Sequence, residues 1–136
     1  MKRRWMLLTC LMSVLTLVVP AWATTFEVSP SSHIVNGEDV VTYDFNILGT
    51  TGTQYYLLRE TRIDTSNNRV WQEDLGPYLG SSLEGGGNFW GWAPNSCAAG
   101  DYNLEIQLLE CDQYGNVASP PVVFATAYTG WITVTY

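Results

Sequence analysis

The sequence predicts an all-β fold, a single two-sheet sandwich of about seven to eight short antiparallel strands. Hydrophobic residues alternate with polar ones over residues 41–47 and 102–108, which is the period of a strand that buries one face. Turn-forming residues separate such stretches at the intervals typical of a sandwich, and no segment shows a helical period.

In the first half of the chain four strands are expected. A short one lies around residues 25–28, and the alternating stretch 41–47 forms the next. Residues 54–61 and 69–75 are rich in strand-forming residues and flank the polar run 64–68. These two strands therefore form a hairpin with a polar loop.

The second half of the chain supplies the remaining strands. A strand at 88–92 follows a run of three glycines, and its Trp90 and Trp92 share one face and are expected to pack in the core. The alternating stretch 102–108 comes next, and residues 131–136 alternate at the end. One domain accommodates all of these elements.

Residues 1–23 are predicted to be a signal peptide that is cleaved. Three basic residues at 2–4 precede the apolar run 6–19, and small residues end the segment at Ala23. The apolar run is too short for a comfortable membrane span, so we expect none in the mature protein. The domain, residues 24–136, is then secreted or periplasmic.

The charge of the chain excludes one class of partner. The net charge is -7, and three of the six basic residues lie in the predicted signal peptide. Only Arg59, Arg62 and Arg69 remain against thirteen acidic residues, which leaves about -10 on the mature segment. A protein that coats nucleic-acid phosphates needs the opposite balance, so nucleic acid is excluded as a partner.

After cleavage two cysteines remain, Cys97 and Cys111, and an oxidising compartment favours a bond between them. If residues 102–110 form one straight strand, it spans about 30 Å, whereas a disulfide needs Cα atoms about 5.5 Å apart. Two alternatives follow: the strand bends or ends near Leu108 and the cysteines pair, or both thiols stay free within one chain. With the single His33, two cysteines supply too few ligands for a zinc site unless subunits share one.

Gly100 and one spacer residue precede Tyr102, and apolar residues follow at alternate positions. This pattern resembles the sixth strand of fibronectin type III and bacterial immunoglobulin-like domains. The resemblance implies a single immunoglobulin-like or fibronectin-III-like β-sandwich. It also gives Tyr102 a structural role, in which the hydroxyl bonds to backbone near the strand entrance and pins that corner. The turn that follows in that superfamily is matched by Asp112, Gly115 and Asn116.

A second resemblance rests on the tryptophans. Val70 and Trp71 follow the polar hairpin loop, and Trp90 precedes Gly100 and Tyr102. This layout is similar to that of the bacterial proteinase-inhibitor-like sandwiches. The sequence differs from them in its signal peptide and in lacking a proline before Gly100. The match includes no reactive loop, so no inhibitory residue is assigned.

Candidate catalytic groups do not combine into a motif. His33 adjoins Ser31 and Ser32, but no nucleophile elbow is present. Glu73 and Asp74 point to opposite faces of a strand and do not form a carboxylate pair. We therefore expect a protein that is not an enzyme and that needs no cofactor.

Calcium has one candidate site, at Asp112 and Asn116. Together with the backbone around Gly115, these residues offer hard oxygen ligands within one turn. An acidic turn is also the ordinary way to end a strand, and the twelve-residue helical calcium loop is absent. Glu38 and Asp39 form a second acidic cluster with the same kind of oxygen ligands.

Two further tryptophans are candidates for binding. Trp71 is expected to share its face with Arg69 and Glu73, and Trp131 to share its face with Thr133 and other threonines. Both indoles are therefore expected on outward surfaces, where they either cover a sheet edge or form a recognition platform for a protein or a glycan.

Three hypotheses about function follow. The first is a small secreted or periplasmic non-catalytic binding module with a protein or glycan partner. The second is an inhibitor of an extracellular or envelope protease that acts through residues 81–88, whose glycines let the loop conform. The third is a structural subunit that assembles by strand addition, because Ile132, Val134 and Tyr136 end in mid-pattern.

Overall fold

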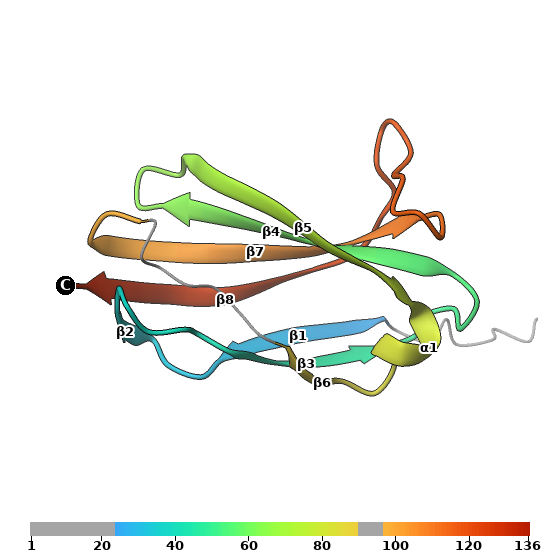
Figure 1. Cartoon of the computed structure of the whole chain (residues 1–136), viewed down its shortest axis with the longest axis horizontal. Helices are drawn as coiled ribbons and strands as arrows, with labels where there is room; N and C mark the ends of the chain where they lie inside the picture. The colour runs from blue at the N-terminus through green and yellow to red at the C-terminus, as the bar shows by residue number, and fades with distance from the viewer. Residues whose placement is uncertain (1–23, 90–96) are drawn as a thin grey trace, which may run out of the picture.

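The computed structural model describes residues 24–89 and 97–136, which form two β-sheets packed face to face and one turn of helix (Figure 1). The all-β prediction is therefore confirmed. The predicted signal peptide, residues 1–23, lies outside the described residues, as do Trp90 and Trp92. The predictions made for those residues stay predictions.

The smaller sheet has three strands in the described residues, in the order β1-β3-β6, all antiparallel. β1 (Thr25–Pro30) pairs along its whole length with β3 (Tyr43–Leu48). β6 (Gly87–Phe89) adds to the other side of β3 and covers the start of the strand predicted at 88–92. This three-stranded sheet forms one layer of the molecule.

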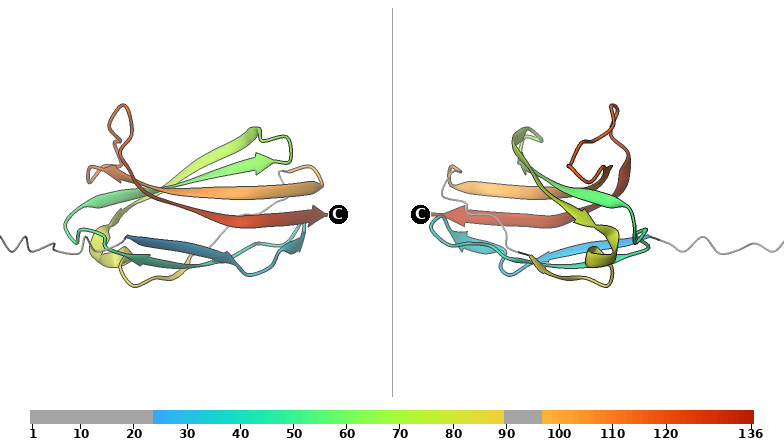
Figure 2. Two further views of the ribbon diagram at one scale, coloured as in Figure 1. Left: turned by 180° about the vertical axis from the view of Figure 1, so that it is seen from behind. Right: turned by 45° about the vertical axis from the view of Figure 1, so that its right-hand side comes forward.

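The second layer is a five-stranded sheet with the order β2-β8-β7-β4-β5. In Figure 2 its strand β5 curves toward the three-stranded sheet, so the larger sheet curls around one side of the core. Its strands are β2 (Ile34–Asn36), β4 (Tyr55–Asp64), β5 (Arg69–Leu79), β7 (Gly100–Cys111) and β8 (Val123–Thr135).

The sequence predicted antiparallel strands throughout, but the structure contains one parallel pair. β2 lies parallel to the end of β8, with Val35 opposite Val134. After β1 the chain leaves the three-stranded sheet and continues along the edge of the other sheet in the direction in which β8 runs. The sequence did not predict β2 because three residues are too few to show an alternating pattern.

Both alternating stretches line the core, as predicted. The side chains of Val41, Tyr43 and Ile47 have no exposed surface. The predicted residues of β7 are also buried and belong to the same cluster: Tyr102, Leu104, Ile106 and Leu108. Burying a large apolar side chain contributes about 1.5–3 kcal/mol, so these two rows supply much of the stability.

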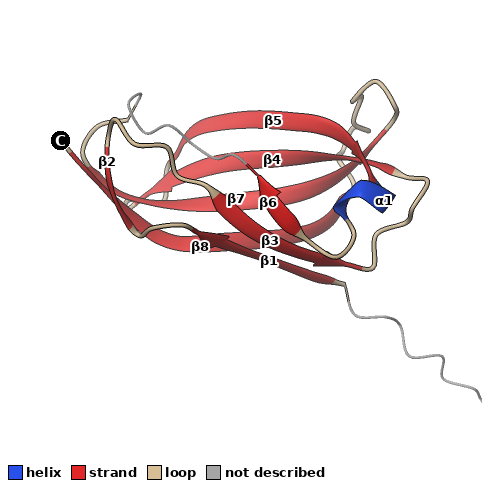
Figure 3. Cartoon of the chain, turned by 60° about the horizontal axis from the view of Figure 1, so that its bottom comes forward, coloured by secondary structure: helices blue, strands red, loops and turns tan. Residues whose placement is uncertain are grey.

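A single helical turn, α1 (Gly80–Leu83), was not predicted. It lies where the chain crosses from β5 to β6 (Figure 3). The carboxylate of Glu84, which follows it, accepts hydrogen bonds from the backbone N–H groups of Gly49 and Thr50, both at 2.9 Å. The backbone N–H of Gly85 donates to the carbonyl of Ile47 at 2.8 Å. Much of the segment 81–88 is thus fixed to the three-stranded sheet.

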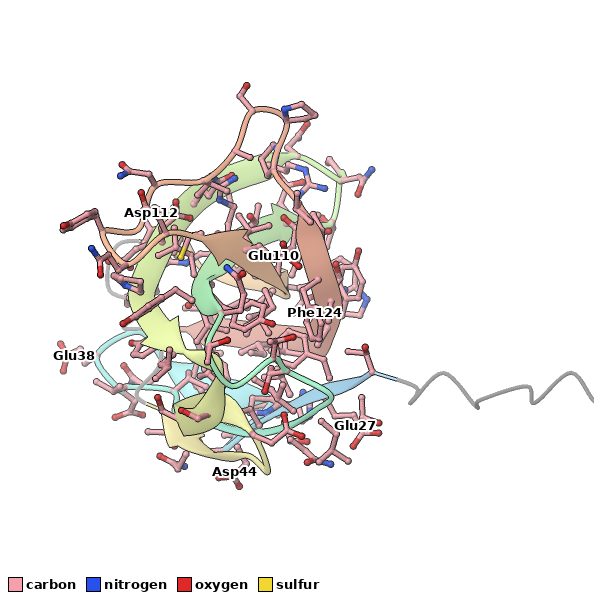
Figure 4. All side chains as sticks on the ribbon, turned by 90° about the vertical axis from the view of Figure 1, so that its right-hand side faces the viewer. Glu27, Glu38, Asp44, Glu110, Asp112 and Phe124 are labelled. Atoms are coloured by element: carbon pink, nitrogen blue, oxygen red, sulfur yellow. The ribbon has the colours of Figure 1, made fainter. Side chains whose placement is uncertain are left out.

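Two turns of the same design end long strands of the five-stranded sheet. In the predicted hairpin β4–β5, which is confirmed, Asp64 Oδ1 accepts from the backbone N–H groups of Ser66 and Asn68 at 2.9 and 2.8 Å. After β7, Asp112 Oδ1 accepts in the same way from Tyr114 and Asn116 at 2.8 and 2.9 Å. Figure 4 shows Asp112 on its turn at this end of the molecule.

The fourth residue of each turn has a positive φ, Asn67 at 62° and Gly115 at 84°. Asparagine and glycine are the residues that tolerate this conformation best, so the two sequences build the same backbone.

Candidate binding surface

Trp131 lies on the outer face of the five-stranded sheet, which is the face turned away from the three-stranded sheet. In the pairing of β8 with β7, Trp131 stands opposite Asn103. The next residue of β7, Leu104, is buried in the core. Neighbouring residues of a strand point to opposite faces, so Trp131 points away from the core. Half of its surface (50%) is exposed. The outward orientation expected for this tryptophan agrees with the structure.

Tyr128 lies beside Trp131 on β8, and its ring is held in place through its hydroxyl. The hydroxyl donates a hydrogen bond to Glu105 Oε2 on β7 at 2.8 Å. Glu105 in turn accepts from Arg69 Nη1 on β5 at 2.7 Å. The residue as a whole remains 53% exposed. We call Tyr128 and Trp131 the aromatic patch, and Arg69 with Glu105 its brace.

The brace is an electrostatic network as well as a geometric one. The hydrogen bond from Arg69 is the main reason why the pKa of Glu105 lies below its ordinary value, and the Tyr128 hydroxyl adds to the effect. The same carboxylate raises the pKa of Tyr128, because a charged acceptor favours the protonated phenol. Glu105 is only 5% exposed. An ionised Glu105 therefore fixes three strands to one another on the outer face.

Trp71 does not lie on this face: it shares its face with Glu73, as predicted, but the prediction that it also shares that face with Arg69 was wrong. The pairing between β4 and β5 shifts at Val70, so that Trp71 stands opposite Arg62 while Arg69 stands opposite Ile63. This bulge places Trp71 and Arg69 on opposite faces, because one extra residue reverses the alternation. Trp71 is half-buried on the side that faces the core.

A cavity of about 190 Å³ lies beside Trp71 and gathers three of the residues that the sequence singled out. Trp71, Tyr102 and Cys97 all line it, together with Arg62. The guanidinium carbon of Arg62 lies 3.8 Å from the centre of the Trp71 ring, a cation–π contact, and its Nη1 lies 3.0 Å from the sulfur of Cys97. Arg62 is buried, so this contact covers the indole from the core side.

Tyr102 makes the kind of bond that its resemblance implied. Its hydroxyl donates to the backbone carbonyl of Ala98 at 2.8 Å, four residues upstream and just before β7 begins. Replacing Tyr102 with phenylalanine is expected to lower the free energy of unfolding by about 1 kcal/mol, because one buried hydrogen bond is lost while the ring still packs. Urea denaturation of both proteins measures this, and an unchanged midpoint would show that the bond does not anchor the corner.

Cys97 and Cys111 are both free thiols in the structure. β7 is one continuous strand of 12 residues that spans about 35 Å, with Cys97 before its start and Cys111 at its end. The straight-strand alternative agrees with this arrangement. The alternative in which the strand ends near Leu108 and the cysteines pair does not.

We therefore expect both thiols of the mature protein to react with a thiol reagent after denaturation without reductant. In the native protein Cys97 should react first, because it is half-exposed whereas Cys111 is buried. Cys111 should react slowly, because burial raises the pKa of its thiol. Absorbance with a chromogenic disulfide reagent gives the count, and a count of zero in a monomer would mean that the two cysteines are bonded.

The side chains of the calcium candidates, Asp112 and Asn116, are hydrogen-bonded within their own turn. Besides its two backbone partners, Asp112 accepts at Oδ2 from the side-chain amide of Asn116 at 2.8 Å. This bond is the main reason why the pKa of Asp112 is lowered. Within the part of the chain that the structure describes, no three His, Cys, Asp or Glu side chains come close enough together to hold a metal ion.

The sequence analysis missed two buried ionisable residues, Glu60 and Arg62. Both lie at every second position after Tyr56 and Leu58 along β4. They therefore share the face of these residues, which is turned toward the core. Glu60 is 5% exposed, and burial raises its pKa to about 7. Residues 55–58 are all apolar, so the sequence gives no alternation that marks which face of the strand is buried.

A comparison with protein-family models gave no match, and a comparison with curated proteins gave no significant match. Over the residues that the structure describes, none of the helices has the length and apolar character needed to cross a membrane.

Proposed function

We propose that the chain is a small, non-catalytic interaction module, secreted or periplasmic, that binds a protein or glycan partner through the aromatic patch. The observation that carries this proposal is the brace: Arg69 and Glu105 hold the Tyr128 ring on the outer face, next to the half-exposed Trp131. Aromatic side chains held in this way lose little conformational entropy when a partner packs on them.

The proposal includes an immunoglobulin-like sandwich as the scaffold. The order β8-β7-β4-β5 corresponds to strands G, F, C and C′ of that fold, and β1-β3-β6 corresponds to A, B and E. Tyr102 then lies near the start of strand F, where the fold places a tyrosine whose hydroxyl bonds to upstream backbone. Such scaffolds carry binding sites on exposed sheet faces and loops.

A role in binding rather than in proton transfer is supported by the partners of the acids on the outer face. Glu105 is engaged by Arg69 and Tyr128, and Asp74 is paired with Arg59 at 2.7 Å. Asp101 accepts from the hydroxyl of Thr133 at 2.6 Å. These carboxylates stabilise the sheet and leave the rings as the contact surface.

Inhibition of a protease is less well supported by the geometry. The hypothesis relied on a conformable loop at 81–88, but α1 and the bonds of Glu84 and Gly85 hold much of that segment against the three-stranded sheet. Inhibitory loops present extended backbone to the protease, which this segment does not. A panel of extracellular proteases assayed with the purified protein tests this hypothesis directly.

The binding proposal is tested by replacing Trp131 with alanine and comparing the variant with Tyr114→Ala. Tyr114 is 78% exposed but lies on the turn after β7, so it controls for the loss of an exposed aromatic side chain. Both variants and the wild type are passed over a glycan array and used as bait in an envelope extract. We expect Trp131→Ala to weaken binding at least about tenfold and Tyr114→Ala to leave it unchanged.

A folded Trp131→Ala protein that binds as well as the wild type would overturn the assignment to the aromatic patch. Circular dichroism of each variant establishes that it is folded. Tyr128→Phe supplies a finer comparison, because it removes only the hydroxyl bond to Glu105 and should weaken binding less than the loss of Trp131.

A further inference from the structure

The cavity beside Trp71 lies on the core-facing side of the five-stranded sheet, away from the aromatic patch. Arg62 of β4, Trp71 of β5 and Tyr102 of β7 line it together with Cys97, which precedes β7. An apolar cavity of about 150 Å³ is large enough to bind benzene. This cavity, at about 190 Å³, therefore has room for a small organic molecule.

Arg62 places a positive charge in the wall of this cavity. The residue is only 3% exposed, and its guanidinium carbon lies 3.8 Å from the centre of the Trp71 ring. A guanidinium presents parallel N–H donors that match the two oxygens of a carboxylate. The attraction between the two charges is also stronger inside a protein than in water. This wall therefore favours a ligand that carries a carboxylate.

Asp64 also lines the cavity, but its carboxylate is engaged by the hairpin turn. Its Oδ1 accepts from the backbone N–H groups of Ser66 and Asn68, and its Oδ2 accepts from the side-chain amide of Asn68 at 3.3 Å. The residue is also partly exposed, so that water screens its charge. Asp64 therefore opposes a carboxylate ligand less strongly than Arg62 attracts it.

Cys97 brings a group that can form a covalent bond into the same cavity. Its sulfur lies 3.0 Å from Nη1 of Arg62, and the residue is half-exposed, so a molecule from solvent can reach it. Two hydroxyl groups hold this segment in place. Tyr102 donates to the carbonyl of Ala98 at 2.8 Å, and Tyr136 donates to the carbonyl of Cys97 at 2.6 Å. The thiol is thus held beside the guanidinium.

We propose that this cavity is a site at which Cys97 forms a mixed disulfide with a small thiol that carries a carboxylate, such as cysteine. The Cys97 thiolate attacks one sulfur of a small disulfide, a new S–S bond forms, and the S–S bond of the small molecule breaks. The other half leaves as a thiolate and takes up the proton that Cys97 released, so the small disulfide is the oxidant.

The carboxylate of the bound half is what selects this class of thiol. A short carbon chain joins the sulfur of cysteine to its carboxylate, and Arg62 lies beside the sulfur to which that chain is bonded. The carboxylate therefore reaches the guanidinium without a change in the strands. Cys111 differs, because it is buried in a separate cluster with Leu57 and Leu109. It serves as an internal reference for the reaction of Cys97.

Two small disulfides of similar length test the proposal, dithiodipropionate, which ends in carboxylates, and cystamine, which ends in ammonium groups. The reduced, folded mature protein is incubated with each at about 0.15 M salt, and mass spectrometry with peptide mapping locates the adduct. We expect dithiodipropionate to modify Cys97 at least about tenfold faster than cystamine, although the acidic chain as a whole attracts cystamine. Cys111 should stay unmodified, and the denatured chain should not prefer dithiodipropionate.

Two variants test the role of the guanidinium. Arg62→Met keeps an unbranched side chain against Trp71 but removes the charge, and it should lower the ratio of the two rates at least about tenfold. Arg59→Met removes the same charge from the outer face of the same strand and should leave the ratio unchanged.

A wild-type ratio of one or less would overturn the proposal, and so would an unchanged ratio in folded Arg62→Met. The wild-type ratio decides the question even where Arg62→Met does not fold. The outcome is separate from the proposed function, because Trp131→Ala tests binding on the outer face, whereas the two disulfides test the core-facing cavity.

Discussion

Replacing Gly86 with alanine is expected to lower the free energy of unfolding by about 3–5 kcal/mol, because two costs combine. The φ of Gly86 is +88°, a conformation that L side chains rarely adopt. A Cβ at this position would also lie 2.3 Å from the carbonyl oxygen of Phe45, which is backbone and has no other position to take. The segment joining α1 to β6 would have to leave β3.

Gly85→Ala is a control that separates these two costs. Gly85 also has a φ of +88°, but a Cβ there meets no atom within 4 Å. Its replacement should therefore cost only the conformational part, about 1–2 kcal/mol. Thermal unfolding of the two variants side by side measures the difference. Equal losses would show that the contact with Phe45 does not constrain the chain.

The second large effect concerns pH. Glu60 is buried in β4, and its pKa is raised from an ordinary 4.5 to about 7, first by burial and then by Glu73 across the ladder, while Arg62 opposes the rise. Between these two pH values the folded protein binds a proton that the unfolded chain has released. The free energy of unfolding therefore decreases as the pH rises from about 4.5 to about 7, by about 3 kcal/mol in all, and levels off above.

Glu60→Gln should remove most of this slope and should raise the stability at pH 8. Glu27→Gln, at an exposed position of β1, is the control and should leave the slope intact. Urea denaturation at intervals between pH 4.5 and pH 8 provides the measurement. If wild-type stability rises across this range, the carboxyl group of Glu60 is ionised in the folded protein.

Other acidic residues change the free energy of unfolding with pH in the opposite direction, and they do so at lower pH. The pKa values of Asp64, Asp112 and Glu84 are lowered by hydrogen bonds from their own turns and from Thr50. The pKa of Glu105 is lowered by Arg69. The stability that these groups contribute is lost as the pH falls below their ordinary values, near 4. We expect the free energy of unfolding to be greatest near pH 5, between the ranges in which these two effects operate.

The parts of the fold that the sequence predicted are those in which one face of a strand is buried over several residues. Tyr43 and Ile47, and likewise Leu104 and Leu108, alternate with polar residues because one side meets the core and the other meets water. The hairpin at Asp64 was predictable as well, because its polar residues form a local turn. Both signals lie within a few consecutive residues.

The parts that the sequence did not predict depend on partners far along the chain. β2 is too short to show a pattern, and its pairing with β8 is set by the path of the chain after β1. The face of Trp71 is reversed by a bulge at Val70, which no residue type marks. Glu60 and Arg62 follow four apolar residues that show no alternation, and their burial is decided by the strands packed around them.

The position of β8 within its sheet has a consequence for how the chain is made. The Thr135 hydroxyl bonds to the carbonyl of Val35, 100 positions earlier. A chain that emerges from a ribosome or through a translocation channel, amino end first, cannot form this contact until β8 has emerged. Since β8 lies between β2 and β7, its late arrival leaves β2 without a strand partner and β7 paired only with β4 until then. We expect this topology to favour folding after synthesis, with closure of the longest loop as the slow step.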